Sequence, residues 1–155
     1  NVAGTIQFDG RDLTTSSVNA QIPLDTLESG IAVRDEDLKG PKYFNTVLYP
    51  KASFHSLKVS KNKDGKYVLS GTFELHGMKK NLDLTLLQPL QIATKAGKQS
   101  LMLSATGAIE QSHYALSLKR LHPDGFVKVN EKIAIKVMVT ANADAAKEPA
   151  IRLEN

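Results

Sequence analysis

Residues 69–86 place the strongest constraint on the fold, because two runs of alternating apolar and polar residues meet there at one short turn. Such alternation is typical of a β-strand that is buried on one face and wet on the other. Gly77, between the two runs, supplies the positive φ that a tight turn needs. The side chains expected on the apolar face are Tyr67, Leu69, Gly71, Phe73, Leu75, Leu82, Leu84 and Leu86. These residues therefore predict a β-hairpin that contributes one face to a shared interior.

The same alternation recurs along most of the chain. It predicts strands over residues 5–8, 17–23 and 133–139, and a meander of four strands over residues 53–109. Residues 28–39 instead show helical spacing, which a Gly-Pro pair then ends. We therefore expect a mainly β protein with one short α-helix between its early strands.

Six or seven antiparallel strands with a one-sided apolar face must cover that face. The sheet either packs against a second sheet or curls into a barrel, and closure also removes the exposed edges. A barrel of about eight strands has an interior just wide enough for side chains or one small or elongated ligand. The 155 residues, 41% of them hydrophobic, suit one such domain. From the residues alone we therefore expect antiparallel strands that form either a barrel or two packed sheets.

Composition excludes several classes of protein. The net charge of +4 comes from interleaved charges, which argues against a nucleic-acid partner. No apolar run reaches the roughly 20 residues that a spanning helix needs, so we do not expect an embedded protein. The absence of cysteine leaves the redox compartment open. The chain begins at Asn1 with no signal-peptide pattern, so we expect that a segment upstream has been removed.

Five pieces of the sequence form a recognisable pattern, namely Arg34-Asp35 with Leu38, Tyr43-Phe44, residues 49–54, residues 71–79 and the closing strand over residues 129–139. In these pieces the chain resembles the YceI-like family of bacterial periplasmic proteins. The resemblance covers about residues 4–141 in matching order and spacing. It implies a lipocalin-like barrel over residues 1–141, binding of polyisoprenoid chains, and a periplasmic or secreted location.

The chain departs from the family's pattern around residues 111–115 and before Gly4. Gln111 and Ala115 stand where the family usually has an arginine and a glycine, so the polar end of the site is expected to differ. The family's first hairpin has no counterpart before Gly4, so that piece is either cut off or supplied by another chain, as in a homodimer.

Residues 142–155 show no periodicity and are expected to form a polar tail.

The inward-facing apolar residues form either a packed core or the lining of a tunnel. Alternation alone favours the core, and the resemblance favours the tunnel. His113 and Tyr114 join this set because they lie in an irregular segment where we expect the barrel mouth. The predicted ligand-binding residues are Phe54, Tyr67, Leu69, Phe73, Leu75, Leu84, Leu86, Leu103, Ile109, His113, Tyr114, Ile133, Ile135 and Val137.

We see no sequence evidence for catalysis. The histidines (His55, His76, His113 and His122) do not have a known metal-ligand spacing, and there is no G-x-S-x-G motif or phosphate-binding glycine-rich loop. The resemblance implies non-enzymatic binding, transport or sequestration of an isoprenoid, quinone-like or other amphiphilic lipid, with no cofactor or metal.

Two rival functions stay open. One is a protein-interaction module with a packed core and a partner on its surface or a strand edge. The other is a small enzyme or metal protein that uses His113. Arg34 is expected to pair locally on the helix or to meet a ligand head group. The lysines at the turns are expected to aid solubility or to give weak peripheral contact with an anionic membrane surface.

Overall fold

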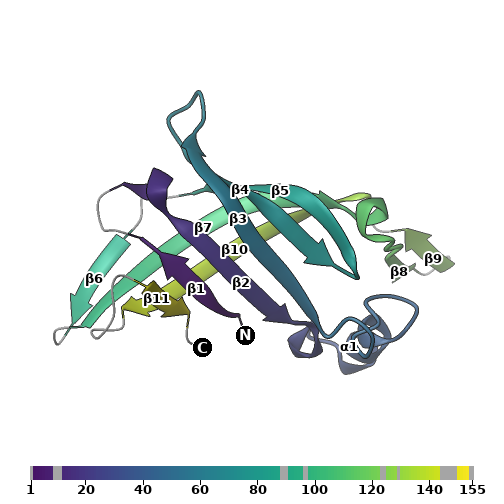
Figure 1. Cartoon of the computed structure of the whole chain (residues 1–155). Coiled ribbons are helices and arrows are strands. Elements are labelled where there is room, and N and C mark those ends of the chain that lie inside the picture. Colours follow the sequence, from purple (N-terminus) through teal and green to yellow (C-terminus); the bar gives the residue numbers. More distant parts are fainter. Residues whose placement is uncertain are drawn as a thin grey trace.

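A ring of antiparallel strands dominates the computed structural model (Figure 1). The structure describes residues 2–8, 12–87, 91–95, 98–122, 125–128, 130–143 and 150–153. The strands are β1 (Ala3–Gln7), β2 (Ser17–Pro23), β3 (Lys51–Lys61), β4 (Tyr67–Leu75), β5 (Met78–Leu86), β6 (Gln91–Lys95), β7 (Lys98–Glu110), β8 (Lys119–His122), β9 (Gly125–Lys128), β10 (Lys132–Ala143) and β11 (Ala150–Leu153). The helices are η1 (Leu13–Thr15), η2 (Leu24–Thr26), α1 (Ala32–Lys39) and η3 (Gln111–Tyr114), of which only α1 is an α-helix.

Eight of these strands close into a barrel. Their order is β10-β11-β1-β2-β3-β4-β5-β7, and β7 pairs with β10 to complete the ring. The β7–β10 ladder is long, running from Lys132 opposite Glu110 to Asn142 opposite Ser100. Because β7 is longer than its neighbours, its first part also pairs with β6 while its middle pairs with β5. The predicted mainly β, antiparallel barrel is confirmed.

The last described strand differs from the sequence prediction. Residues 142–155 were expected to be a polar tail, whereas β10 continues to Ala143 and β11 pairs on one side with β1 and on the other with β10. Gly4 lies opposite Leu153, and Ala141 lies opposite the same residue from the other side. A four-residue strand is too short to show alternation, and its partner β1 is almost the whole chain away. The ring is therefore closed by this chain's own β11, and the described residues need no second chain to complete it.

The helix also begins later than its pattern predicts. The expected helix covered residues 28–39, but α1 starts at Ala32 because Gly30 has a φ of 81° and cannot be helical there. The Asp35 carboxylate accepts a hydrogen bond from the Ser29 N–H at 2.6 Å, and the Arg34 side chain donates to the Ser29 hydroxyl and carbonyl at 2.7 Å. Arg34 therefore anchors the start of the helix locally.

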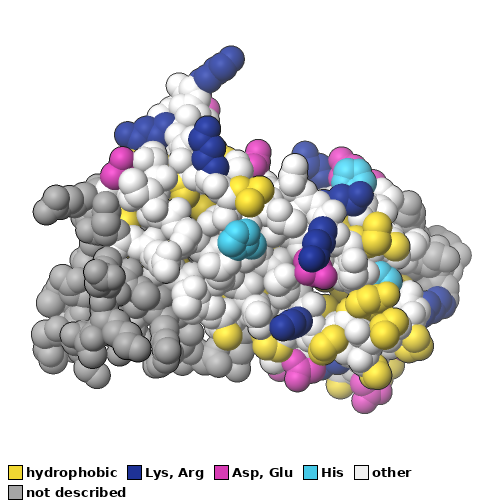
Figure 2. All heavy atoms as spheres, in the orientation of Figure 1, with side chains coloured by type: hydrophobic (Ala, Val, Ile, Leu, Met, Phe, Trp, Pro, Cys, Tyr) yellow, Lys and Arg dark blue, Asp and Glu magenta, His cyan; other side chains and the backbone are white. Residues whose placement is uncertain are grey.

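The α1 segment adds surface rather than core. None of its residues is buried, and Figure 2 shows hydrophobic side chains gathered on the surface near this end of the molecule. Elsewhere on that face, charged side chains of both signs are scattered. The large exposed apolar residues of this segment and the loop after it are Ile31, Val33, Val47 and Leu48.

The hairpin predicted from residues 69–86 is confirmed in detail. Leu75 lies opposite Met78, so β4 and β5 are joined by a two-residue turn of His76 and Gly77, which both have positive φ. Two successive positive φ values are typical of the turn that matches the twist of antiparallel strands. The His76 ring packs against the Tyr49 ring at a centroid distance of 4.5 Å. This contact ties the hairpin turn to the loop before β3.

Candidate functional site

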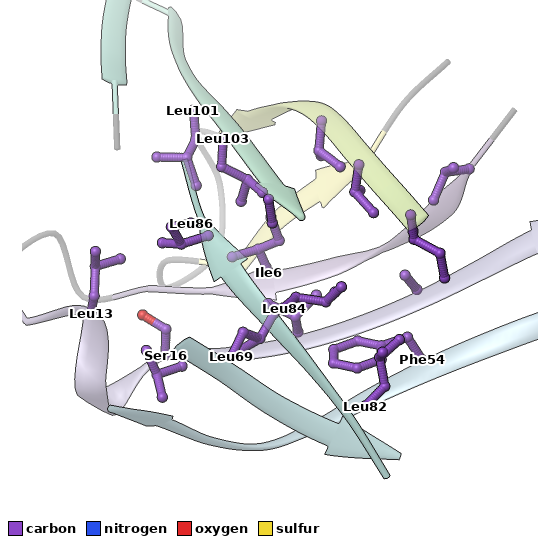
Figure 3. A pocket seen from close by; sticks show the side chains of 18 of the residues that line it. Ile6, Leu13, Ser16, Phe54, Leu69, Leu82, Leu84, Leu86, Leu101 and Leu103 are labelled. Carbon is purple, nitrogen blue, oxygen red and sulfur yellow. The ribbon is translucent and has the colours of Figure 1, made fainter. Parts of the chain in front are cut away.

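The barrel encloses an apolar cavity of about 230 Å³. Strands β1, β2, β3, β4, β5, β7 and β10 all contribute to its wall, so no short segment of sequence contains the site (Figure 3). Among the residues that line it, Ser16 is the one that is not hydrophobic. The lining residues are Val2, Ile6, Phe8, Leu13, Ser16, Val18, Ala20, Ile22, Phe54, Val59, Leu69, Phe73, Leu82, Leu84, Leu86, Leu101, Leu103, Ala105, Ile135, Val137 and Val139.

Strand alternation explains why these side chains meet. On β7 and β10 the lining residues are spaced by two, and their registers place Ala105 opposite Val137 and Leu103 opposite Val139. On β2 the series Val18, Ala20 and Ile22 follows the same rule. Each strand therefore turns one row of apolar side chains toward the barrel axis.

Gly71 shapes the wall on the β3–β4 side. A Cβ atom at this position would stand 2.5 Å from the Phe54 ring and 2.5 Å from the His55 carbonyl oxygen. The missing side chain therefore lets the Phe54 ring lie directly over the backbone of β4. A larger residue at position 71 would force the Phe54 ring away from this position over β4.

The barrel end near η3 is a packed core. Tyr114 is only 2% exposed and meets Phe73 edge to face, with ring centroids 5.7 Å apart. Burial raises the pKa of the Tyr114 phenol above its ordinary value. Leu24 and Leu75 are buried in the same cluster and do not line the cavity. The cavity therefore stops at the Phe73–Tyr114 pair.

Gln111, one of the departures from the family's pattern, closes this same end. Its side chain is fully buried, and its amide nitrogen donates to the Asn130 carbonyl at 2.8 Å. Its side-chain oxygen accepts from the Leu118 N–H at 2.6 Å. A neutral amide thus joins the segments on both sides of the β8–β9 hairpin without placing a charge in the core.

The structure brings eight of the fourteen predicted site residues together around the cavity. Three others, Leu75, Ile109 and Tyr114, are buried in the packed core outside the lining, and Tyr67 and Ile133 are partly buried against it. His113 is exposed, and its Nε2 lies 3.1 Å from the Glu110 carboxylate. The eight lining residues are Phe54, Leu69, Phe73, Leu84, Leu86, Leu103, Ile135 and Val137. His113 and Tyr114 do not line the cavity, because the His113 side chain is exposed and Tyr114 is buried in the packed cluster.

Sequence reasoning missed mainly the wall formed by the first two strands. The alternation of Val18, Ala20 and Ile22 was a usable signal, but β1 is too short to show its inward face. It pairs with β2 on one side and with β11 on the other, and no local pattern indicates the pairing with β11. The lining residues outside the predicted set are Val2, Ile6, Phe8, Leu13, Ser16, Val18, Ala20, Ile22, Val59, Leu82, Leu101, Ala105 and Val139.

The polar residues of the described chain are dispersed. No three histidine, aspartate or glutamate side chains in the described ranges lie close enough together to hold a metal ion. His55 is exposed on β3, where its ring contacts the Asn19 side chain on β2. Within the same ranges, no helix is both long enough and apolar enough to cross a membrane. The cavity is therefore the most distinctive candidate site in the described structure.

An antiparallel barrel around an apolar cavity defines a class of protein whose interior can take up a hydrophobic molecule. Residues 1–141 match the YceI-like domain, and the chain belongs to this family. This agrees with the resemblance drawn from the sequence.

Curated relatives share part of the chain. A UPF0312 protein of Photorhabdus laumondii is 38% identical over 77 residues, and one of Yersinia pestis is 33% identical over 81 residues. These matches cover 50% and 52% of this chain but only 40% and 42% of the relatives, so they span less than half of those proteins.

Solved structures show the same fold over most of the chain. The YCEI protein of Campylobacter jejuni superposes with a TM-score of 0.75 at 21% identity, covering 93% of this chain and 82% of the other. BcnA of Burkholderia cenocepacia gives a TM-score of 0.69 at 16% identity, covering 91% and 84%. At these identities the likeness concerns the fold.

Proposed function

We propose that this protein binds an isoprenoid or a similar amphiphilic lipid inside the barrel, as a carrier or sequestering protein without catalytic activity. The observation that carries the proposal is the cavity of about 230 Å³ whose described lining is hydrophobic except for Ser16. An apolar chain has almost no hydrogen-bonding groups, so its affinity comes from burial, at about 25 cal/mol per Å² before the costs of binding. The apolar lining of this cavity supplies the surface against which such a chain is buried.

The shape of the cavity favours a chain-like ligand. Its lining residues on the β2 side run from Ser16 to Ile22, a distance of about 20 Å along an extended backbone. Apolar cavities of about 150 Å³ take up benzene, so a volume of about 230 Å³ accommodates a hydrocarbon segment on the order of ten carbons. Membership of the YceI-like family favours an isoprenoid as the source of that segment.

The lining also indicates which part of an amphiphilic ligand enters the cavity. None of the described residues that line the cavity carries a charge. Burying an ion without a partner is strongly unfavourable, so a charged head group would stay outside while the tail enters. The expected ligand therefore has an uncharged inner segment.

The experiment that tests this function is organic extraction of freshly purified protein followed by mass spectrometry, with native mass spectrometry for stoichiometry. We expect one isoprenoid-type lipid per chain, or uptake of one added isoprenoid by stripped protein. Ala105→Phe, which places a ring in the cavity, should abolish uptake. Ala134→Phe is the matched control because Ala134 is exposed on the outer face of β10.

Two results would contradict the proposal. Stripped, folded protein that takes up no isoprenoid would favour the interaction-module alternative. Uptake that survives Ala105→Phe unchanged would mean that the lipid binds elsewhere on the protein.

A further inference from the structure

The hydroxyl of Ser16 is a polar group without a partner in an apolar cavity. Its oxygen is buried and has no hydrogen-bond partner, and it is the one oxygen among the side chains drawn in Figure 3. Its backbone N–H is already used, because it donates to the Leu13 carbonyl at 3.1 Å. Ser16 stands two residues before Val18, so it extends the inward-facing row of β2 by one position.

Ser16 and Ile22 are the two ends of this row of lining residues. A buried hydroxyl left without a partner loses the hydrogen bonds that it makes with water in the unfolded chain. An isolated water molecule is a poor substitute, because buried waters need two to four polar partners and no other described lining side chain is polar. The site therefore lacks one hydrogen-bonding atom that a ligand could bring.

We propose that Ser16 recognises an oxygen atom on the bound lipid, which makes the ligand a neutral oxygenated isoprenoid, such as an alcohol or a carbonyl compound, rather than a pure hydrocarbon. This inference rests on the proposed lipid-binding function. A serine hydroxyl both donates and accepts, so it can pair with a carbonyl oxygen or with an alcohol. A phosphate is disfavoured at this position, because no described lining residue is cationic.

The placement of Ser16 also orients the ligand. The oxygen is held where β2 begins, and the hydrocarbon runs along Val18 and Ala20 toward Ile22. Phe54, which lies opposite Ala20, and Phe73, which lies opposite Phe54, form the adjoining wall along this part of the row. Ser16 is a specificity-determining residue in this arrangement, whereas the apolar wall supplies most of the affinity.

The test compares geraniol with myrcene, an isoprenoid hydrocarbon with the same number of carbons, by displacement of a fluorescent fatty-acid probe from stripped protein. We expect wild type to prefer geraniol by roughly three- to tenfold, the effect of one net hydrogen bond. Ser16→Ala should remove this preference by weakening geraniol binding and leaving myrcene binding unchanged. Ser17→Ala is the matched control, because the neighbouring Ser17 hydroxyl donates instead to the exposed Gln7 side chain at 3.1 Å. This control should behave as wild type.

The outcomes separate the inference from the function on which it rests. Suppose that both ligands bind to wild type and that Ser16→Ala either weakens both to the same extent or weakens neither. The hydrogen bond to Ser16 is then refuted, and lipid binding stands. If neither ligand binds to folded wild type, the proposed function fails, and the inference fails with it. A readout without ligand completes the test: Ser16→Ala should raise the urea midpoint of the empty protein, because it removes an unpaired buried hydroxyl. A lower midpoint would mean that the hydroxyl is already paired and would overturn the inference.

Discussion

Enlarging Ala105 should separate an open cavity from a packed core. Ala105 is 1% exposed, lies on β7 between Leu86 of β5 and Val137 of β10, and lines the cavity. Ala105→Leu adds three carbon atoms that project into this space. We therefore expect the ligand-free variant to be at least as stable as wild type.

The size of the effect follows from burial. Each added carbon contributes about 0.8 kcal/mol when it leaves water, which gives about 2.4 kcal/mol for three. Ordering a leucine side chain costs about 0.5 to 1 kcal/mol. The expected gain in the free energy of unfolding is therefore about 1 to 2 kcal/mol, which a urea titration followed by circular dichroism resolves as a higher midpoint at constant slope.

Ala52 provides the matched control. It is also 1% exposed and belongs to the same buried hydrophobic cluster as Ala105, but it does not line the cavity. Ala52→Leu should lower the free energy of unfolding by about 1 to 3 kcal/mol, because overpacking a filled core forces its neighbours to move. Equal destabilisation by both substitutions would refute the cavity. Native mass spectrometry must show that all samples are free of lipid, because a bound ligand adds its own stability.

Three further predictions concern the wall, the packed end and the helix. Gly71→Ala should lower the free energy of unfolding by about 1 to 3 kcal/mol, because its Cβ would press on Phe54 and on the backbone of β3; unchanged urea unfolding would contradict the close approach. Gln111→Leu should lower the free energy of unfolding by a similar amount, about 1 to 3 kcal/mol, because it removes two part-buried hydrogen bonds to the backbone, and a neutral result would show that water replaces the amide. The pKa of Asp35 should lie below its ordinary value in an NMR titration, mainly because of its hydrogen bond with Ser29. The stability from this contact is therefore present above the pKa of Asp35 in the unfolded chain and is lost as the pH falls through the pKa in the folded protein. An Asp35 pKa at or above the ordinary value would contradict this contact.

Alternation and turn chemistry determined much of the architecture from the sequence alone. The β4–β5 hairpin follows from every-second-residue apolar patterning and from Gly77, and the inward rows of β7 and β10 follow from the same rule. These are local properties, set by the geometry of a strand and the φ values that a glycine allows. They were sufficient to predict antiparallel strands and the inward direction of eight residues that line the cavity, whereas the cavity itself was favoured by the family resemblance.

Tertiary structure alone decided where the barrel closes and which part of its interior is empty. β11 pairs with β1 across nearly the whole chain, and no local pattern encodes a partner at that distance. Leu75 and Leu84 follow the same alternation in one hairpin and are buried in one hydrophobic cluster, yet Leu84 lines the cavity and Leu75 does not. The difference arises because Tyr114 fills one end of the barrel, and local alternation does not specify which residues fill the space between the strands.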